Sequence, residues 1–219
     1  MNVKEPLILV LLGSPGSGKG TQAELISQSY SIPHISTGDL FRREIQKQSP
    51  LSRELLSYIS QGSLVPDNLV IKTITSILSS NEYPFGYILD GFPRTLPQAK
   101  NLNYFLNEQG KKYLVLNFAI SQDIVINRLI SRLNCNFCKK IFQKNQDLSE
   151  GSLCPNCLQG KLFSRDDDNP QTIANRLEIY KKQTEPIELF YKSLGILKNI
   201  NAQKSPKEIF EEIKQTLPF

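Results

Sequence analysis

The sequence predicts an α/β fold in which helices cover both faces of a parallel sheet. Residues 7–12 are continuously apolar, which is typical of a central parallel strand that is buried on both sides. Helical spacing follows this run, and further strand-like stretches at 87–89, 113–120 and 196–200 are separated by helical patterns. Strands that alternate with helices in this way predict βαβ units, and therefore a parallel sheet.

Capping residues predict where several helices begin and end. A helix is predicted over 122–133, because its apolar residues form one stripe. Asn169 and Pro170 form an N-cap and N1 pair that opens a long helix, which Pro186 is expected to break or kink. Ser205, followed by Pro and, two residues later, by Glu, is a capping box that opens the last helix.

Length, composition and charge limit the kind of protein. The chain has 219 residues, enough for one sizeable domain, and its 39% hydrophobic and 21% charged residues exclude a disordered chain. The net charge of +5 is below that of a dedicated nucleic-acid binder. No apolar run is longer than residues 7–12, so we expect a soluble, cytoplasmic protein without a membrane span or cleavable signal. No unpaired apolar stripe demands a partner, so we expect a monomer.

A glycine-rich segment, residues 13–21, lies between the first strand and the first helix. Its sequence, Gly-Ser-Pro-Gly-Ser-Gly-Lys-Gly-Thr, predicts a phosphate-binding loop, because the glycines let backbone N–H groups surround phosphate oxygens. Lys19 would reach the β and γ phosphates of a nucleotide. Gly20 stands where the general pattern has Ser or Thr for Mg²⁺, and Thr21 follows it. The alternative is a plain glycine-rich turn with an exposed lysine.

The strand at 87–89 is followed by Asp90, a carboxylate at the position where a residue that faces Mg²⁺ belongs. The next residue is Gly91, and not a Glu that would activate water. We therefore expect that something other than water accepts the phosphoryl group, and that Asp90 acts on Mg²⁺ through water.

Five motifs in order resemble those of the adenylate kinases, the nucleoside monophosphate kinases that move phosphate between ATP and AMP. They are the phosphate loop at 13–22, Ser-Thr-Gly-Asp-Leu-Phe-Arg at 36–42, Asp-Gly-Phe-Pro-Arg-Thr at 90–95 with Gln98, Arg165 with three aspartates, and Arg176-Leu177. The resemblance extends from about residue 7 to residue 217. It implies a P-loop core with a parallel five-stranded sheet flanked by helices over 1–35, 66–127 and 166–219. It also implies a small helical AMP-binding insert over 36–65 and a zinc-bearing lid over 128–165.

The resemblance also assigns residues to both substrates. The groups expected to act on the transferred phosphoryl are Lys19, Arg94, Arg132, Arg165 and Arg176. ATP would be bound by Gly16, Ser17, Gly18, Lys19, Gly20, Thr21, Arg128, Arg132, Ile141, Phe142 and the backbone of Lys204. AMP would be bound by Thr37, Arg42, Ser63, Leu64, Val65, Gly91, Phe92, Pro93, Arg94, Gln98, Arg165 and Arg176. Planar arginines suit these roles because they grip phosphate with two hydrogen bonds and stay charged.

Two arginines are expected to share one helix face. Arg128 and Arg132 are four residues apart in the helix predicted over 122–133. A solvated basic face is the alternative, but positions 124–146 hold no Asp or Glu, which favours an anion as the partner. The aspartates at 166–168 are expected to orient arginines and hinge the lid rather than bind metal.

Two residues of the sequence favour AMP over other phosphoryl acceptors. Thr37 matches the adenylate-specific form of its motif, whereas relatives for uridine and cytidine monophosphates usually carry Ala there. Gln98 could pair with the adenine edge through its amide. The alternatives are that Thr37 is a helix N-cap and Gln98 a surface amide, and a uridine or cytidine monophosphate kinase remains open.

Four cysteines have the spacing of a zinc site. They form two C-x2-C pairs separated by fifteen residues: Cys135, Cys138, Cys154 and Cys157. Disulfides and redox pairs are the alternatives. The resemblance is to long-lid bacterial adenylate kinases with a structural zinc, so the expected cofactors are Zn²⁺ in the lid and Mg²⁺ with ATP. The lone histidine, His34, lies outside this cluster and is expected to be structural.

A protein of another class could carry the same features. The cysteines could form a zinc ribbon that binds nucleic acid, with basic residues at Lys139, Lys140 and Lys144 and a P-loop that drives movement. Against this, one small ribbon offers few contacts, and no Glu follows Asp90. We therefore expect ATP, AMP and ADP as partners, and neither nucleic acid nor a membrane.

Overall fold

The structure is a computed structural model that describes residues 6–47, 50–79 and 83–217. At its centre is a five-stranded sheet in the order β2-β3-β1-β4-β8, and every pairing in it is parallel. The strands are β1 (Leu7–Leu12), β2 (His34–Ser36), β3 (Gly86–Asp90), β4 (Leu114–Ala119) and β8 (Leu197–Asn201). The predicted α/β class and parallel sheet are confirmed.

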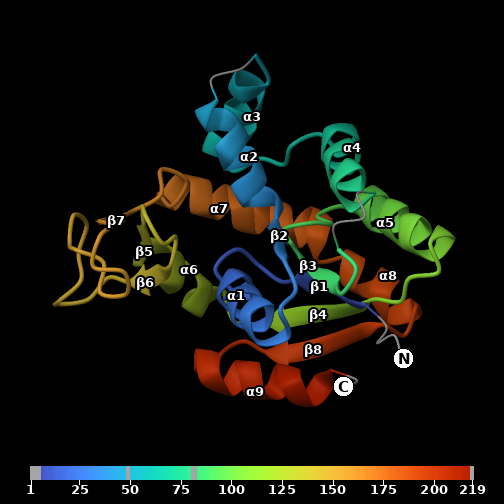
Figure 1. The fold of residues 1–219 in the computed structure, drawn as a ribbon. Coiled ribbons are helices and arrows are strands. Elements are labelled where there is room, and N and C mark those ends of the chain that lie inside the picture. Colours follow the sequence, from blue (N-terminus) through green and yellow to red (C-terminus); the bar gives the residue numbers. More distant parts are fainter. Residues whose placement is uncertain (1–5, 48–49, 80–82, 218–219) are drawn as a thin grey trace.

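Helices cover both faces of this sheet, and β1 contributes to both halves of the core (Figure 1). Its odd-numbered residues lie in a cluster with α1 (Lys19–Tyr30) and α9 (Pro206–Thr216). Its even-numbered residues lie in a cluster with α4 (Asp67–Leu78), α5 (Leu96–Glu108) and α8 (Ile187–Ser193). Burial on both faces explains why the residues of β1 are apolar without alternation.

Two helices stand away from the sheet, at the top of Figure 1. These are α2 (Thr37–Gln46) and α3 (Pro50–Ser60), and they pack against one another. Helix α2 begins directly after β2, where the side chain of Ser36 accepts a hydrogen bond from the backbone N–H of Asp39. The end of β2 therefore places the start of α2 beside the carboxyl end of β3, to which β2 is paired.

A second, antiparallel sheet lies at the side of the molecule (Figure 1). It has the order β6-β5-β7 and consists of β5 (Arg132–Cys135), β6 (Ile141–Gln143) and β7 (Leu162–Phe163). We call it the lid sheet. Its small core contains Leu133, Leu162 and two of the cysteines.

The predicted end of the helix over 122–133 is wrong. Helix α6 covers Gln122–Ile130, and Ser131 is its C-cap. Leu133 falls four residues after Leu129, so the apolar stripe fits a longer helix, but Leu133 is buried in the lid sheet instead. Backbone pairing of β5 with both β6 and β7 replaces the last helical turn.

The predicted helix boundaries in the C-terminal half are confirmed. Helix α7 (Pro170–Ile179) is capped by Asn169, whose side chain accepts from the backbone N–H of Thr172. It continues into a π-helical turn, η1 (Tyr180–Thr184), before Pro186 precedes α8. The capping box at Ser205 opens α9. No helix in the described part of the chain is both long and apolar enough to cross a bilayer.

Candidate active site and metal centre

The loop between β1 and α1 is curled around the ammonium group of its own lysine. Lys19 Nζ donates hydrogen bonds to the carbonyl oxygens of Gly13 at 2.7 Å and Ser14 at 2.8 Å, and to Ser17 Oγ at 3.2 Å. Gly16 has a φ of 81°, and a Cβ there would lie 2.9 Å from Leu129. The loop therefore needs glycine both for its backbone conformation and for its close packing on α6.

The N-terminus of α1 is open to an anion. Its N-cap is Gly18, so no side chain caps it, and its first turn holds no acidic residue. Side chains cap α2, α5, α7 and α9, in contrast. Free N–H groups and the positive end of the helix dipole together suit phosphate oxygens.

The charge of Lys19 is poorly stabilised by the protein alone. Burial lowers the pKa of Lys19 to about 8, although the nearby carboxylate of Asp90 opposes this shift. Positive charges act with burial, and they come from Arg94, Arg176 and Arg132. A polyphosphate beside the ammonium would supply the missing negative charge.

Asp90 lies at the end of β3, next to this loop. Its Oδ2 is 3.3 Å from His34 Nε2, and a Cβ on Gly20 would lie 3.6 Å from the same oxygen. The expected structural role of His34 is therefore a contact with Asp90, from the neighbouring strand β2. An added Cβ on Gly20 would therefore make only an ordinary contact with this carboxylate.

A pocket lies between α2, α3, α4 and the end of β3, and Arg42, Arg94 and Arg176 line it. Of the residues predicted for AMP, nine line it: Thr37, Arg42, Ser63, Leu64, Val65, Gly91, Arg94, Gln98 and Arg176. Phe92 and Pro93, joined by a cis peptide bond, are buried and do not line this pocket, and neither does Arg165. Sequence reasoning missed three apolar lining residues, Phe41, Ile59 and Val70, because their spacing reads as ordinary helix core.

The structure excludes the two alternative roles, in which Thr37 is a helix N-cap and Gln98 is a surface amide. Ser36, and not Thr37, caps α2, while Thr37 Oγ1 donates to the carbonyl of Gly91 at 2.8 Å. Gln98 is only 1% exposed, so it is no surface amide. Its Oε1 accepts from the backbone N–H of Arg94 at 2.7 Å.

Arg128 and Arg132 do not share a helix, contrary to the prediction. Arg128 is in α6, and Arg132 begins β5. Arg132 donates two hydrogen bonds to Asp168, from Nε at 2.7 Å and from Nη2. The acidic partner of Arg132 therefore lies 36 residues later in the chain. The absence of Asp and Glu from positions 124–146 did not mean that Arg132 lacks an acidic partner in the fold.

Of the three aspartates expected to orient arginines, Asp167 and Asp168 contact them. Arg176 Nη1 contacts Asp167 Oδ2 at 3.0 Å and Asp168 Oδ1 at 3.3 Å. Arg165 itself donates from Nε to Asn134 Oδ1 at 3.1 Å, a partner on β5 that sequence reasoning missed. Arg42 pairs with Asp39 at 2.6 Å within α2.

The guanidinium groups are close enough to repel one another. Burial lowers the pKa of Arg94 to about 10, and the charges of Arg176 and Arg42 add to this effect. Burial lowers the pKa of Arg165 to about 10 as well, with Arg132 and Arg42 as further causes. Arginines from α2, the lid sheet and α7 thus repel one another, and a bound anion would reduce this repulsion.

The residues predicted for the ATP base lie on three elements. Arg128 Nη1 donates to the carbonyl of Ala202 at 3.1 Å and lies beside Gly18. The turn that contains Ala202 also contains Lys204, whose exposed side chain pairs with Glu212. Ile141 and Phe142 are on β6, where Phe142 packs against the lid core.

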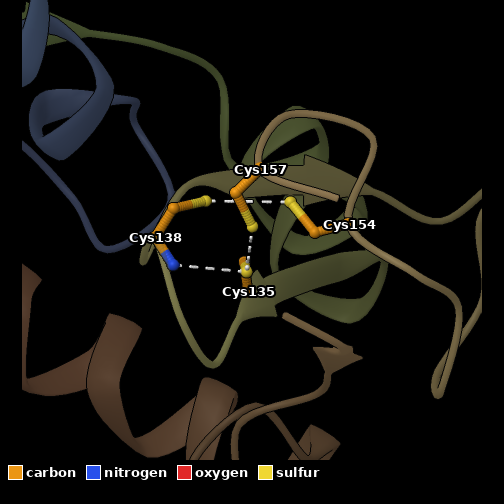
Figure 2. Close-up of side chains that lie close together, drawn as sticks. All are labelled: Cys135, Cys138, Cys154 and Cys157. Carbon is orange, nitrogen blue, oxygen red and sulfur yellow. Dashed lines mark hydrogen bonds between the residues drawn. The ribbon is translucent and has the colours of Figure 1, made fainter. Parts of the chain in front are cut away.

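The four cysteines meet at one point, as Figure 2 shows. Their sulfur atoms all lie within 4.8 Å of one another, and all four thiols are free. The distances are 3.6 Å for Cys135 to Cys157 and 3.7 Å for Cys138 to Cys154. Four thiolates around Zn²⁺ would be about 3.8 Å apart, from a Zn–S bond of about 2.3 Å and tetrahedral geometry. The donor set and its spacing therefore fit zinc.

Backbone groups of the cluster favour thiolates. The N–H groups of Phe137 and Cys138 donate to Cys135 Sγ at 3.4 Å. The N–H of Gly160 donates to Cys157 Sγ at 3.4 Å, and it lowers the pKa of Cys157 to about 6. Such N–H donors stabilise the charged sulfur that a metal requires.

Comparisons with known proteins agree with this geometry. The sequence model of the family described as adenylate kinase matches residues 11–196. An adenylate kinase of Clostridium tetani is 42% identical over 212 residues, covering 95% of this chain and 97% of its own length. That of Bacillus subtilis is 41% identical with the same coverage, and that of Chlamydia muridarum is 40% identical over 98% of this chain and 88% of its own. These matches show that the chain belongs to the adenylate kinase family.

Proposed function

We propose that the chain transfers the terminal phosphoryl group of ATP, bound with Mg²⁺, reversibly to AMP, so that two molecules of ADP result. The observation that carries this proposal is the position of the cations. Lys19 belongs to the phosphate-binding loop, and Arg94 and Arg176, which line the second pocket, are close enough to lower the pKa of Lys19. Two phosphorylated substrates that meet there would neutralise this charge.

The proposed division of the chain follows its elements. The core would comprise 1–35, 66–127 and 166–219, the AMP-binding insert 36–65 and the zinc lid 128–165. The packing of α2 on α3 and the separate lid sheet support this division. We further propose that one chain acts alone, because loop, pocket and arginines all come from the same chain, and that the protein acts in the cytoplasm.

On the ATP side, the loop residues 16–21 would bind the phosphates through backbone N–H groups and Lys19. Mg²⁺ bound with ATP would neutralise phosphate charge, with Asp90 balancing the cation. Arg128 and the backbone at Lys204 would face the base, because Arg128 reaches the turn at Ala202. Ile141 and Phe142 would cover it from β6.

On the AMP side, Arg42 and Arg94 would bind the phosphate, and the pocket that contains Thr37 and Gln98 would take the base. Phe92 and Pro93 would shape the loop beneath it. Arg132, Arg165 and Arg176 would span the transferred group, since Asp168 pairs with Arg132 and Asp167 pairs with Arg176. Positioning and charge neutralisation are the main demands of phosphoryl transfer.

The zinc would be structural. Four cysteines leave no open position on the metal, so it would hold the two knuckles together. The lid sheet has only a small apolar core, and a metal would compensate for this. A stable lid can then exclude water from the transfer.

A panel of acceptors tests the proposed function. The chain is assayed with Mg²⁺ and ATP, with AMP, UMP, CMP, GMP or no acceptor, and the diphosphate products are measured. ADP that forms only with AMP supports the proposal. Preference for UMP or CMP would overturn the acceptor assignment, and ADP without any acceptor would indicate hydrolysis. Lys19→Ala should lower transfer by at least about a hundredfold while the fold persists.

A further inference from the structure

The amide of Gln98 is held at both ends inside the pocket proposed for AMP. Its Oε1 accepts from the backbone N–H of Arg94 at 2.7 Å, and its Nε2 donates to Asp67 Oδ1 at 2.7 Å. The side chain is 1% exposed, so water does not replace these contacts freely. Both ends of the amide are therefore fixed by the protein before any base arrives.

Asp67 is itself anchored. It is the first residue of α4, and its second oxygen, Oδ2, accepts from Thr95 Oγ1 at 2.9 Å. Thr95 in turn caps α5, the helix that contains Gln98. The carboxylate thus connects the start of α4 to the start of α5.

These partners permit only one orientation of the amide. A backbone N–H can only donate, and a carboxylate oxygen can only accept. If the amide of Gln98 turned over, its NH₂ would face the N–H of Arg94 and its oxygen would face the carboxylate of Asp67. Both contacts would then be repulsive.

We propose that Asp67 sets the base preference of this pocket by fixing the amide of Gln98, so that a 6-aminopurine is accepted over a 6-oxopurine. This inference rests on the proposed function. Each end of the amide keeps one free valence, a lone pair on Oε1 and a hydrogen on Nε2. Together they present an acceptor beside a donor.

Adenine complements that pattern. Its 6-amino group donates, and the ring nitrogen on either side of it accepts. Hypoxanthine carries an oxygen at position 6, which would meet Oε1 with two acceptors facing one another. For a 6-oxo base placed as adenine is, only a reversed amide could form both hydrogen bonds, and Asp67 opposes that reversal.

Asp67 also has an ordinary structural role that the test must separate. An acidic residue in the first turn of a helix is stabilising by itself. Asp123 provides a matched control, because it is an exposed acidic residue in the first turn of α6. A structural role at a helix start would not distinguish one base from another.

The experiment measures kcat/KM for AMP and for IMP at saturating Mg²⁺ and ATP. Asp67→Leu keeps the branched shape of the side chain but has two methyl groups and no acceptor, and it should lower the AMP:IMP ratio by about tenfold, mainly through the KM for AMP. Asp67→Asn, whose Oδ1 can still accept, should keep most of the ratio. Asp67→Ala repeats the test if the Leu variant folds poorly, and Asp123→Leu should leave the ratio unchanged.

A second background shows whether Asp67 acts through Gln98. In Gln98→Ala, the further change Asp67→Leu should alter the AMP:IMP ratio by less than about twofold. An unchanged ratio in Asp67→Leu, or the same tenfold loss in both backgrounds, overturns the inference. Because turnover of AMP by the wild-type chain tests the proposed function separately, these results overturn the inference alone, whereas a wild type that prefers UMP or CMP overturns both.

Discussion

Asp168 binds Arg132 although the two residues are 36 positions apart, with Oδ2 accepting from Nε at 2.7 Å. The other oxygen of the same carboxylate lies 3.3 Å from Arg176 Nη1. Asp168 is only 3% exposed. One buried carboxylate therefore sets the spacing between an arginine of the lid sheet and an arginine of α7.

Asp168→Asn is expected to lower kcat by up to about a hundredfold, because misplaced arginines no longer match the transferred group. The KM for ATP should change less, since the loop at 13–21 is untouched. Steady-state kinetics measure both. Asp147→Asn, at an exposed lid residue, serves as the control. Wild-type kcat in Asp168→Asn would contradict the positioning role.

Binding of nucleotide is expected to take up a proton between about pH 8 and 9. In the free protein the pKa of Lys19 is lowered to about 8, and phosphate charge raises it in the complex. Above pH 8 the free lysine is therefore neutral while the bound one is charged, so binding gains a proton and the affinity falls as pH rises.

Calorimetry with a non-hydrolysable ATP analogue, in two buffers of different ionisation enthalpy, measures this proton uptake. At about pH 6.5 the lysine is charged in both states, so its uptake should vanish. Lys19→Met should abolish the uptake at pH 8.5. Equal uptake by that variant and the wild type would assign the proton to another group.

Removal of the proposed zinc is expected to lower the unfolding midpoint by roughly 5 °C or more, because the metal would bind the folded lid and not the unfolded chain. Calorimetric scans with and without a zinc-selective chelator, in the absence of Mg²⁺, measure the shift. Elemental analysis should find one zinc per chain. If the purified chain contains no metal and its unfolding midpoint does not change with the chelator, the zinc site is excluded.

Gly160→Ala is expected to weaken metal binding. A Cβ at this position would lie 2.4 Å from Cys135 Sγ and 2.7 Å from Phe137 Cβ, so the knuckles would have to separate. Competition with a chromophoric chelator measures the affinity. Gly151→Ala is the control for a lid glycine whose added Cβ meets nothing within 4 Å, although its φ of 85° strains an alanine there and the φ of Gly160 does not. Equal losses in both variants would show that the contact of the added Cβ with Cys135 is not the cause.

Local motifs were predicted correctly from the sequence, whereas the end of α6 was not. The caps at Asn169 and Ser205 depend on neighbours in sequence, so the sequence indicates them directly. The end of α6 depends on strand pairing with residues 141–143 and 162–163. Periodicity alone could not decide between Leu133 as a helix residue and as a strand residue, because its position fits both.

The sequence by itself determined the parallel α/β core, the phosphate loop and the four-cysteine cluster, since each depends on residue types at short, fixed spacings. Only the tertiary structure decided that Arg132 pairs with Asp168 and that Asp67 holds Gln98. These contacts join separate elements, and no local pattern marks them. The physical reason is that a buried charge or amide takes whichever partner the fold brings within reach, however distant in the chain.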